Sequence, residues 1–98
     1  MSLRDEFGAA VRSAIGQCYD LGYIPSRFEQ MIESAHPIEV AKRLVVSGEF
    51  QHGIRELTKL GHKELTIEGI MQQERFSSLF TNAELQAAAW RLANVPTT

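Results

Sequence analysis

The chain is poor in the residues that mark disulfide scaffolds, membrane spans and nucleic-acid surfaces. Its 98 residues include a single cysteine, Cys18, so no disulfide can form among them. No apolar run approaches the roughly 20 residues of a membrane-spanning helix, and we expect a cytoplasmic protein. The formal net charge is only -2, from 10 basic and 12 acidic residues that are interleaved along the chain. Net charge therefore gives no reason to expect nucleic acid or an anionic membrane as a partner.

The alternation of apolar and polar residues that indicates a strand is also missing. No Gly-Lys-Ser/Thr follows Gly48 and Gly53, so a P-loop is not expected. Apolar residues instead recur every three or four positions, which is the helical period. The sequence therefore predicts an all-α fold, an irregular orthogonal bundle of five or six short helices. We expect a single domain, residues 1–98, with its core between about 3 and 95 and a frayed tail at 96–98.

Side chains that can cap a helix predict where the helices begin. A fifth helix is expected to start near Thr66, and residues 76–80 are too short for more than a turn or a 3₁₀ piece. At three other starts a Ser or Thr precedes an acidic residue by three positions, which is the spacing of a capping box. These pairs are Ser2 with Asp5, Ser26 with Glu29, and Thr81 with Glu84.

Residues that cannot continue a helix predict where the helices end. Glycine suits the left-handed C-terminal cap, and a residue before proline is pushed out of helical geometry. The predicted ends are Gly22, His36 before Pro37, Gly48 and Gly61. The apolar stripes between starts and ends are Phe7, Val11, Ala14, Ile15 and Cys18; Phe28, Met31, Ile32 and Ala35; Ile38, Ala41, Leu44 and Val45; Phe50, Ile54, Leu57 and Leu60; and Leu85, Ala88, Ala89 and Leu92.

A series of short motifs resembles a pattern found in small uncharacterised bacterial proteins. The motifs are Leu21-Gly22-Tyr23, Pro25, Arg27-Phe28, Met31-Ile32, Ala41-Lys42-Arg43-Leu44, Leu57, Leu60-Gly61, Glu64-Leu65-Thr66-Ile67-Glu68, Phe76, Leu79-Phe80-Thr81 and Glu84-Leu85. Together they cover roughly residues 21 to 92. The resemblance implies a self-contained helical module, which stands alone or belongs to a larger chain. No activity is established for that family, so the resemblance carries over no catalytic residue.

Three sets of polar residues are candidates for a catalytic or metal site. Cys18 shares a stripe with Val11 and Ile15 and has no local histidine, so we interpret it as a core residue rather than a nucleophile. Glu29 and Glu33 share a helix face but show no sign of burial. A metal set of His52, Glu56 and His62 is conceivable, since two histidines and a carboxylate can bind zinc. It lacks a paired-histidine motif, so we favour solvated surface and expect no catalytic residue, cofactor or metal.

Nucleic-acid binding through the turn at Gly48 is the first alternative function. The helices on either side of this turn resemble a helix-turn-helix. Against it, Arg43 and Leu44 stand where that motif has an apolar and then a small residue, and Glu49 and Glu56 add negative charge. The side chains that would contact nucleic acid are Gln51, His52, Arg55, Lys59 and Lys63.

The last helix is the main candidate for a protein interface. At about 100° per residue, Trp90 falls with Ala83 and Ala87 nearly opposite the core stripe of this helix. A helix that is apolar on two sides is either enclosed by the domain or carries an interface. Trp is also favoured at the centres of interfaces. The alternative is that the amino-terminal helix covers Trp90.

A ligand or peptide groove near Tyr23, Arg27 and Phe28 is a further possibility. The simpler interpretation makes Phe28 a core residue, Tyr23 a half-buried lid on the turn and Arg27 solvated. Taken together, the sequence favours a non-catalytic protein–protein interaction or accessory module, which is homodimeric through its last helix in one version. Nucleic-acid binding is the alternative, and a small metal protein is the second alternative.

Overall fold

A computed structural model describes the backbone of residues 2–46 and 52–95. Every regular element along these two stretches is a helix, which confirms the predicted all-α fold. None of the described helices combines the length and the apolar composition that crossing a membrane requires. The elements are α1 (Leu3–Asp20), α2 (Ser26–Ser34), α3 (Pro37–Val46), α4 (His52–Lys59), the 3₁₀ helix η1 (Lys63–Leu65), α5 (Ile67–Met71), the 3₁₀ helix η2 (Glu74–Leu79) and α6 (Asn82–Ala93).

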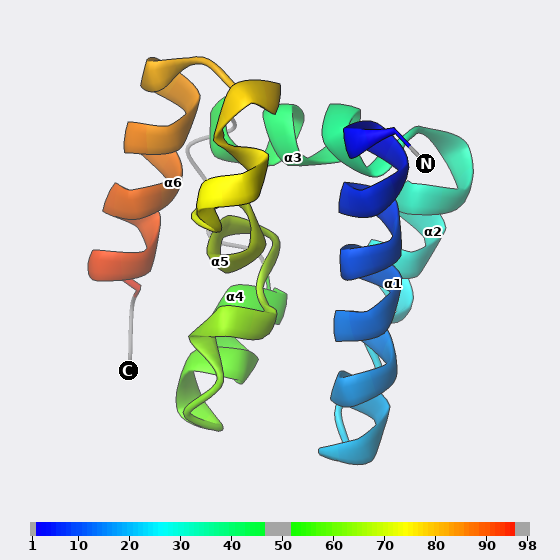
Figure 1. Cartoon of the computed structure of the whole chain (residues 1–98). Coiled ribbons are helices and arrows are strands. Elements are labelled where there is room, and N and C mark those ends of the chain that lie inside the picture. The colour runs from blue at the N-terminus through cyan, green and yellow to red at the C-terminus, as the bar shows by residue number, and fades with distance from the viewer. Residues whose placement is uncertain (1, 47–51, 96–98) are drawn as a thin grey trace.

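The helices are arranged around α5. Helices α1 and α6 stand on opposite sides of the molecule with α5 between them, and α3 crosses behind at one end (Figure 1). Helix α3 packs against α1, α5 and α6, while α4 packs mainly against η1. This order leaves α6 as an outer helix that packs mainly against α5 and α3.

Most of the predicted helix boundaries are confirmed. Capping boxes form at Ser2 and Thr81, and the Thr66 hydroxyl accepts a hydrogen bond from the Gly69 N–H. Gly22 and Gly61 have positive φ angles of 83° and 79°, which a side chain would strain. The predicted end at Gly48, the predicted stripe residue Phe50 and the predicted tail at 96–98 lie outside the described residues.

The predicted capping box of Ser26 and Glu29 is wrong. Helix α2 already begins at Ser26, so Pro25 occupies the cap position and no side chain caps this helix. The Glu29 carboxylate instead accepts a hydrogen bond from the Tyr19 hydroxyl on α1. A contact between helices has therefore replaced the local one.

The core is centred on three aromatic rings. Phe7 of α1 stands edge-on to Phe76 and Phe80, with ring centroids 5.1 and 5.3 Å apart, a favourable arrangement for aromatic pairs. Most of the predicted stripes contribute to this core, but Leu60 and Ala89 are exposed, contrary to prediction. Leu60 lies beyond the end of α4, in the turn that Gly61 closes.

Arg91, which is not part of the predicted apolar stripe, lies on the buried side of α6. Its Nε donates a hydrogen bond of 2.9 Å to Oε2 of Glu68 in α5, and the two side chains are only 3% and 2% exposed. Because Arg91 faces inward, α6 is rotated so that Ala89 faces out. A buried ion pair therefore joins α6 to the centre of the fold, where loss of either partner would leave an uncompensated charge.

Candidate functional site

The outer side of α6 is the first candidate site. Trp90 is 60% exposed, and the expectation that the amino-terminal helix covers it is wrong because α1 stands on the far side of α5 (Figure 1). Ala83 is exposed beside it and Ala87 is half-buried. We call this surface the α6 face. At 100° per residue it comprises Ala83, Gln86, Ala87, Trp90, Ala93 and Asn94.

The α6 face carries no charged side chain. The helix has only two, Glu84 and Arg91. Arg91 is buried against Glu68, and Glu84 lies on the flank, where its carboxylate is 3.8 Å from Nζ of Lys42. Within α6 the neighbours of the exposed Trp90 on this face are therefore alanines and uncharged amides.

A cavity of about 550 Å³ between α1, α2, α4 and α5 is the second candidate site. Its volume lies within the range of small-molecule sites, which are roughly 300–1,000 Å³. Buried apolar side chains form its inner wall, among them Val11 and Cys18 of α1 and Leu57 of α4. Phe28 and Met31 line it from α2, and both are half-buried side chains that pack against the core, as the sequence predicted for Phe28 in part.

The cavity wall changes the ionisation of two side chains. Burial raises the pKa of the Cys18 thiol above its ordinary value of 9.0. Burial also raises the pKa of the half-buried Tyr23 hydroxyl, and the nearby Cys18 and Glu56 add to that increase. A thiol kept protonated in apolar surroundings is a poor nucleophile, which agrees with the interpretation of Cys18 as a core residue.

The mouth of the cavity combines apolar and basic groups. Ile24, which is 60% exposed, lines it together with the exposed residues Ser26 and Arg27. The predicted positions of Tyr23, half-buried, and Arg27, in solvent, are confirmed. Across the cavity Glu68 also contributes to the wall, but its charge is paired with Arg91.

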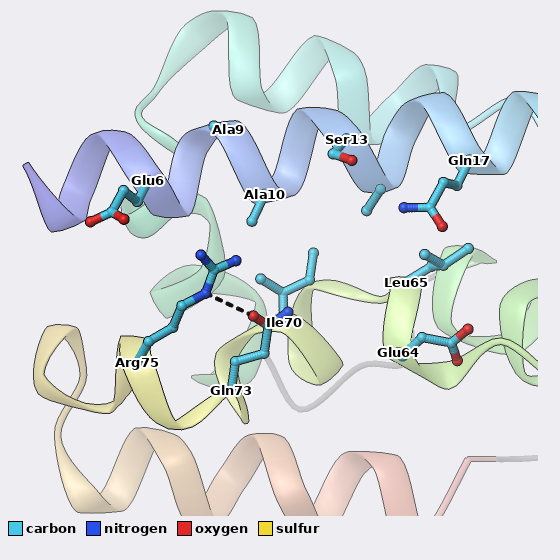
Figure 2. Close-up of a pocket in the computed structure, with 11 residues that line it drawn as sticks. Glu6, Ala9, Ala10, Ser13, Gln17, Glu64, Leu65, Ile70, Gln73 and Arg75 are labelled. Atoms are coloured by element: carbon cyan, nitrogen blue, oxygen red, sulfur yellow. Dashed lines mark hydrogen bonds between the residues drawn. The ribbon is translucent and has the colours of Figure 1, made fainter. Parts of the chain in front are cut away.

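A second hollow, of about 480 Å³, lies between α1 and the segment from Glu64 to Arg75 (Figure 2). Small side chains, Ala9, Ala10 and Ser13, line it from α1. On the opposite wall, Arg75 donates a hydrogen bond of 3.0 Å to the Gln73 side chain, and its guanidinium lies 4.3 Å from the centre of the Phe76 ring. Arg75, the basic residue that lines this hollow, is thus already in contact with Gln73 and Phe76 of its own segment.

The residues of the conceivable metal set have other neighbours. Nδ1 of His62 lies 2.8 Å from Oε1 of Glu64, and this hydrogen bond lowers the pKa of the Glu64 carboxyl. The Glu56 carboxylate is 3.6 Å from Nζ of Lys59, and the side chain of His52 lies outside the described residues. In the part of the chain that is described, no three histidine, cysteine or acidic side chains gather as metal ligands would.

The candidate nucleic-acid surface is only partly assembled. Arg55 and Lys59 are exposed on α4, but Nζ of Lys63 donates a hydrogen bond of 2.7 Å to the carbonyl oxygen of Leu92 near the end of α6. Lys63 therefore stabilises the C-terminus of α6, where a positive charge is favourable. Gln51 lies outside the described residues, and α4 packs mainly against η1, whereas the two helices of a helix-turn-helix pack together.

Comparison with known proteins adds no identity to these surfaces. No family model, no curated protein and no solved structure matches the chain. The function must therefore be argued from the α6 face and the cavity themselves.

Proposed function

We propose that this chain is a non-catalytic protein–protein interaction module that pairs with a second copy of itself through the α6 face. The observation that carries the proposal is Trp90, 60% exposed on an outer helix whose opposite side is buried. The apolar surface of a large exposed aromatic ring is removed from water only when another molecule covers it, which is favourable. Trp is also enriched at the centres of interfaces.

The absence of charge on the α6 face favours a second copy as the partner. In a two-fold dimer each surface meets its own duplicate, so any charge in the middle of the patch faces a like charge. The α6 face avoids this repulsion, because Glu84 lies on the flank and Arg91 is buried. Ala83 and Ala87 are small enough to let the Trp90 ring of the other copy lie against the helix backbone.

The size of the face predicts how strong such a dimer is. A helix of 12 residues is ~18 Å long and ~10 Å wide. The area that one face of this helix can bury is therefore well below the ~800 Å² that each partner buries in a stable complex. Even with neighbouring side chains included, we expect a weak and reversible dimer. The association should therefore depend on protein concentration over the range used in solution experiments.

Size-exclusion chromatography with light scattering, over a range of protein concentrations, tests the proposal. Wild-type protein should shift from monomer towards dimer as concentration rises. Trp90→Glu should remain monomeric at every concentration, because two buried carboxylates would face each other. Leu60→Glu is the matched control: Leu60 is an exposed apolar residue, 44% accessible, that lies outside α6.

Each outcome distinguishes the proposal from its alternatives. A dimer that persists in Trp90→Glu would contradict the α6 face as the interface. Loss of the dimer in Leu60→Glu as well would show that any added charge is sufficient. A wild-type protein that stays monomeric at millimolar concentration would contradict self-association altogether.

A further inference from the structure

We propose that the cavity between α1, α2, α4 and α5 binds an amphipathic organic anion, with the apolar body inside and a carboxylate at Arg27. This inference concerns a different surface from the α6 face and does not depend on it. It rests on the volume of the cavity, the chemistry of its wall and the position of the basic group in its lining.

The wall of the cavity is suited to an apolar ligand. Aliphatic, aromatic and sulfur-containing side chains from α1, α2 and α4 line it, among them Ile15, Met31 and Ile54. Burying apolar ligand surface against such a wall stabilises the bound state. Met31 adds adaptability, because an unbranched thioether fits ligands of different shape. A volume of about 550 Å³ accommodates a medium-length alkyl chain or a fused ring pair.

The mouth of the cavity determines the charge of the ligand. Besides Cys18 and Tyr23, the lining contains two ionisable side chains, Arg27 and Glu68, and Glu68 is paired with Arg91. Arg27 makes no hydrogen bond or ion pair with any other residue in the described stretches. Its guanidinium can therefore donate hydrogen bonds to the carboxylate of a ligand. The basic group thus stands where the polar end of a ligand would emerge.

The local structure of α2 supports the same polarity. The capping box expected from sequence does not form there, because Glu29 is bonded to Tyr19 instead. The first turn of α2 therefore has no side chain that accepts hydrogen bonds from its backbone N–H groups. The Ser26 N–H donates to the Ile24 carbonyl oxygen, which leaves the Arg27 N–H of this turn for a ligand carboxylate. A departure from a local sequence rule is expected where a site requires it.

Competition with a fluorescent dye tests the proposal. Anilinonaphthalene sulfonate, an apolar ring system with one anionic group, should bind wild-type protein with saturable, one-to-one stoichiometry. Decanoate should displace it, and decanol and decylamine, which have the same chain length, should do so less effectively. Circular dichroism on the same samples checks that the protein stays folded, because partly unfolded proteins also bind this dye.

Two arginine variants separate the polar contact from general charge. Arg27→Gln should weaken decanoate binding about threefold to fivefold, as loss of an exposed ion pair does, and leave decanol binding unchanged. Arg12→Gln removes the same charge from an exposed position on α1 outside the cavity lining, and should change neither. An equal loss in both variants, or equal affinity for decanoate and decanol, would overturn the anionic part of the proposal.

A chemical readout locates the ligand in the cavity. Cys18 is the sole cysteine and lies in the wall, so its reaction with a small maleimide reports on access to the interior. Decanoate should slow that reaction over the same concentration range in which it displaces the dye. Displacement of the dye without protection of Cys18, or no binding of either probe, would overturn the assignment of this cavity.

Discussion

The two sides of α5 differ in how completely they are filled. Towards α6 and η1, contact is so close that a Cβ at Gly69 would clash with the Lys63 carbonyl oxygen, and the buried pair of Glu68 and Arg91 joins the helices. Towards α2 and α4, the same segment borders a cavity of about 550 Å³. One short helix thus separates a densely packed side from a hollow one.

This contrast indicates that the two sides have different tasks. Protein interiors are normally close-packed, so the side of α5 towards α6 follows the general rule. Close packing holds α6 in one orientation, with Arg91 inward and Trp90 outward. The cavity departs from that rule, which agrees with a place reserved for a ligand. Substitutions of similar size should therefore have opposite effects on the two sides.

The largest effect is expected from breaking the buried ion pair. Glu68→Gln removes the carboxylate that pairs with the buried Arg91 guanidinium, so the free energy of unfolding should fall by about 3–5 kcal/mol. Urea denaturation followed by circular dichroism measures the loss.

The double variant Glu68→Leu, Arg91→Met is the control for that experiment. Replacing both charges with apolar side chains of similar volume is often neutral or stabilising, so most of the lost stability should return. If the double variant were as unstable as Glu68→Gln, packing rather than charge would explain the loss.

A smaller loss is expected from one methyl group on the densely packed side. Gly69→Ala places its Cβ against the Lys63 carbonyl and 3.0 Å from Cα of Glu64, so backbone must move. We expect a loss of about 1–3 kcal/mol, as for other overpacked positions. Gly16→Ala is the matched control, because its Cβ would meet no atom within 4 Å. Equal stability of the two variants would contradict close packing at Gly69.

Added volume on the hollow side should have the opposite sign. Cys18→Met extends an apolar side chain into the cavity and should be neutral or stabilise the fold by up to about 1 kcal/mol. Thermal unfolding of the variant beside wild type provides the measurement. A loss as large as that of Gly69→Ala would show that the cavity wall is as tightly packed as the other side.

The smallest effect concerns alkaline pH. Cys18 and Tyr23 have raised pKa values because burial favours their neutral forms, so the fold binds these protons more tightly than the unfolded chain does. Their contribution to stability is complete below the ordinary thiol value of 9.0 and is lost as the pH rises through the raised values. The melting temperature of wild type should therefore decline more steeply above this pH than that of Cys18→Met. Parallel curves would contradict burial of the thiol.

Local features of the fold were predictable because their causes are local. Ser2 and Thr81 cap helices that begin immediately after them, and Gly22 and Gly61 adopt the left-handed conformation their positions require. The outward position of Trp90 followed from angular spacing along one helix. In each case the feature depends on residues that are only a few positions apart in the sequence.

Features that depend on distant residues could not be read from the sequence. Glu68 and Arg91 are 23 positions apart, and each alone resembles an ordinary solvated charge on a helix. Glu29 was expected to cap its own helix, but Tyr19 of α1 accounts for its position. The groove considered near Tyr23, Arg27 and Phe28 lies at the cavity, but the volume of the cavity and its walls from α1, α4 and α5 are what remains after all the helices have packed, so no spacing predicts them.

Fluorescence of the only tryptophan tests the central claim, an exposed Trp90 that a second copy covers, most directly. In dilute wild-type protein the emission should resemble that of tryptophan in water and be readily quenched by iodide. It should shift to shorter wavelength and become protected as protein concentration rises. Emission of a buried ring at the lowest concentration, or a water-like spectrum at every concentration, would contradict the account.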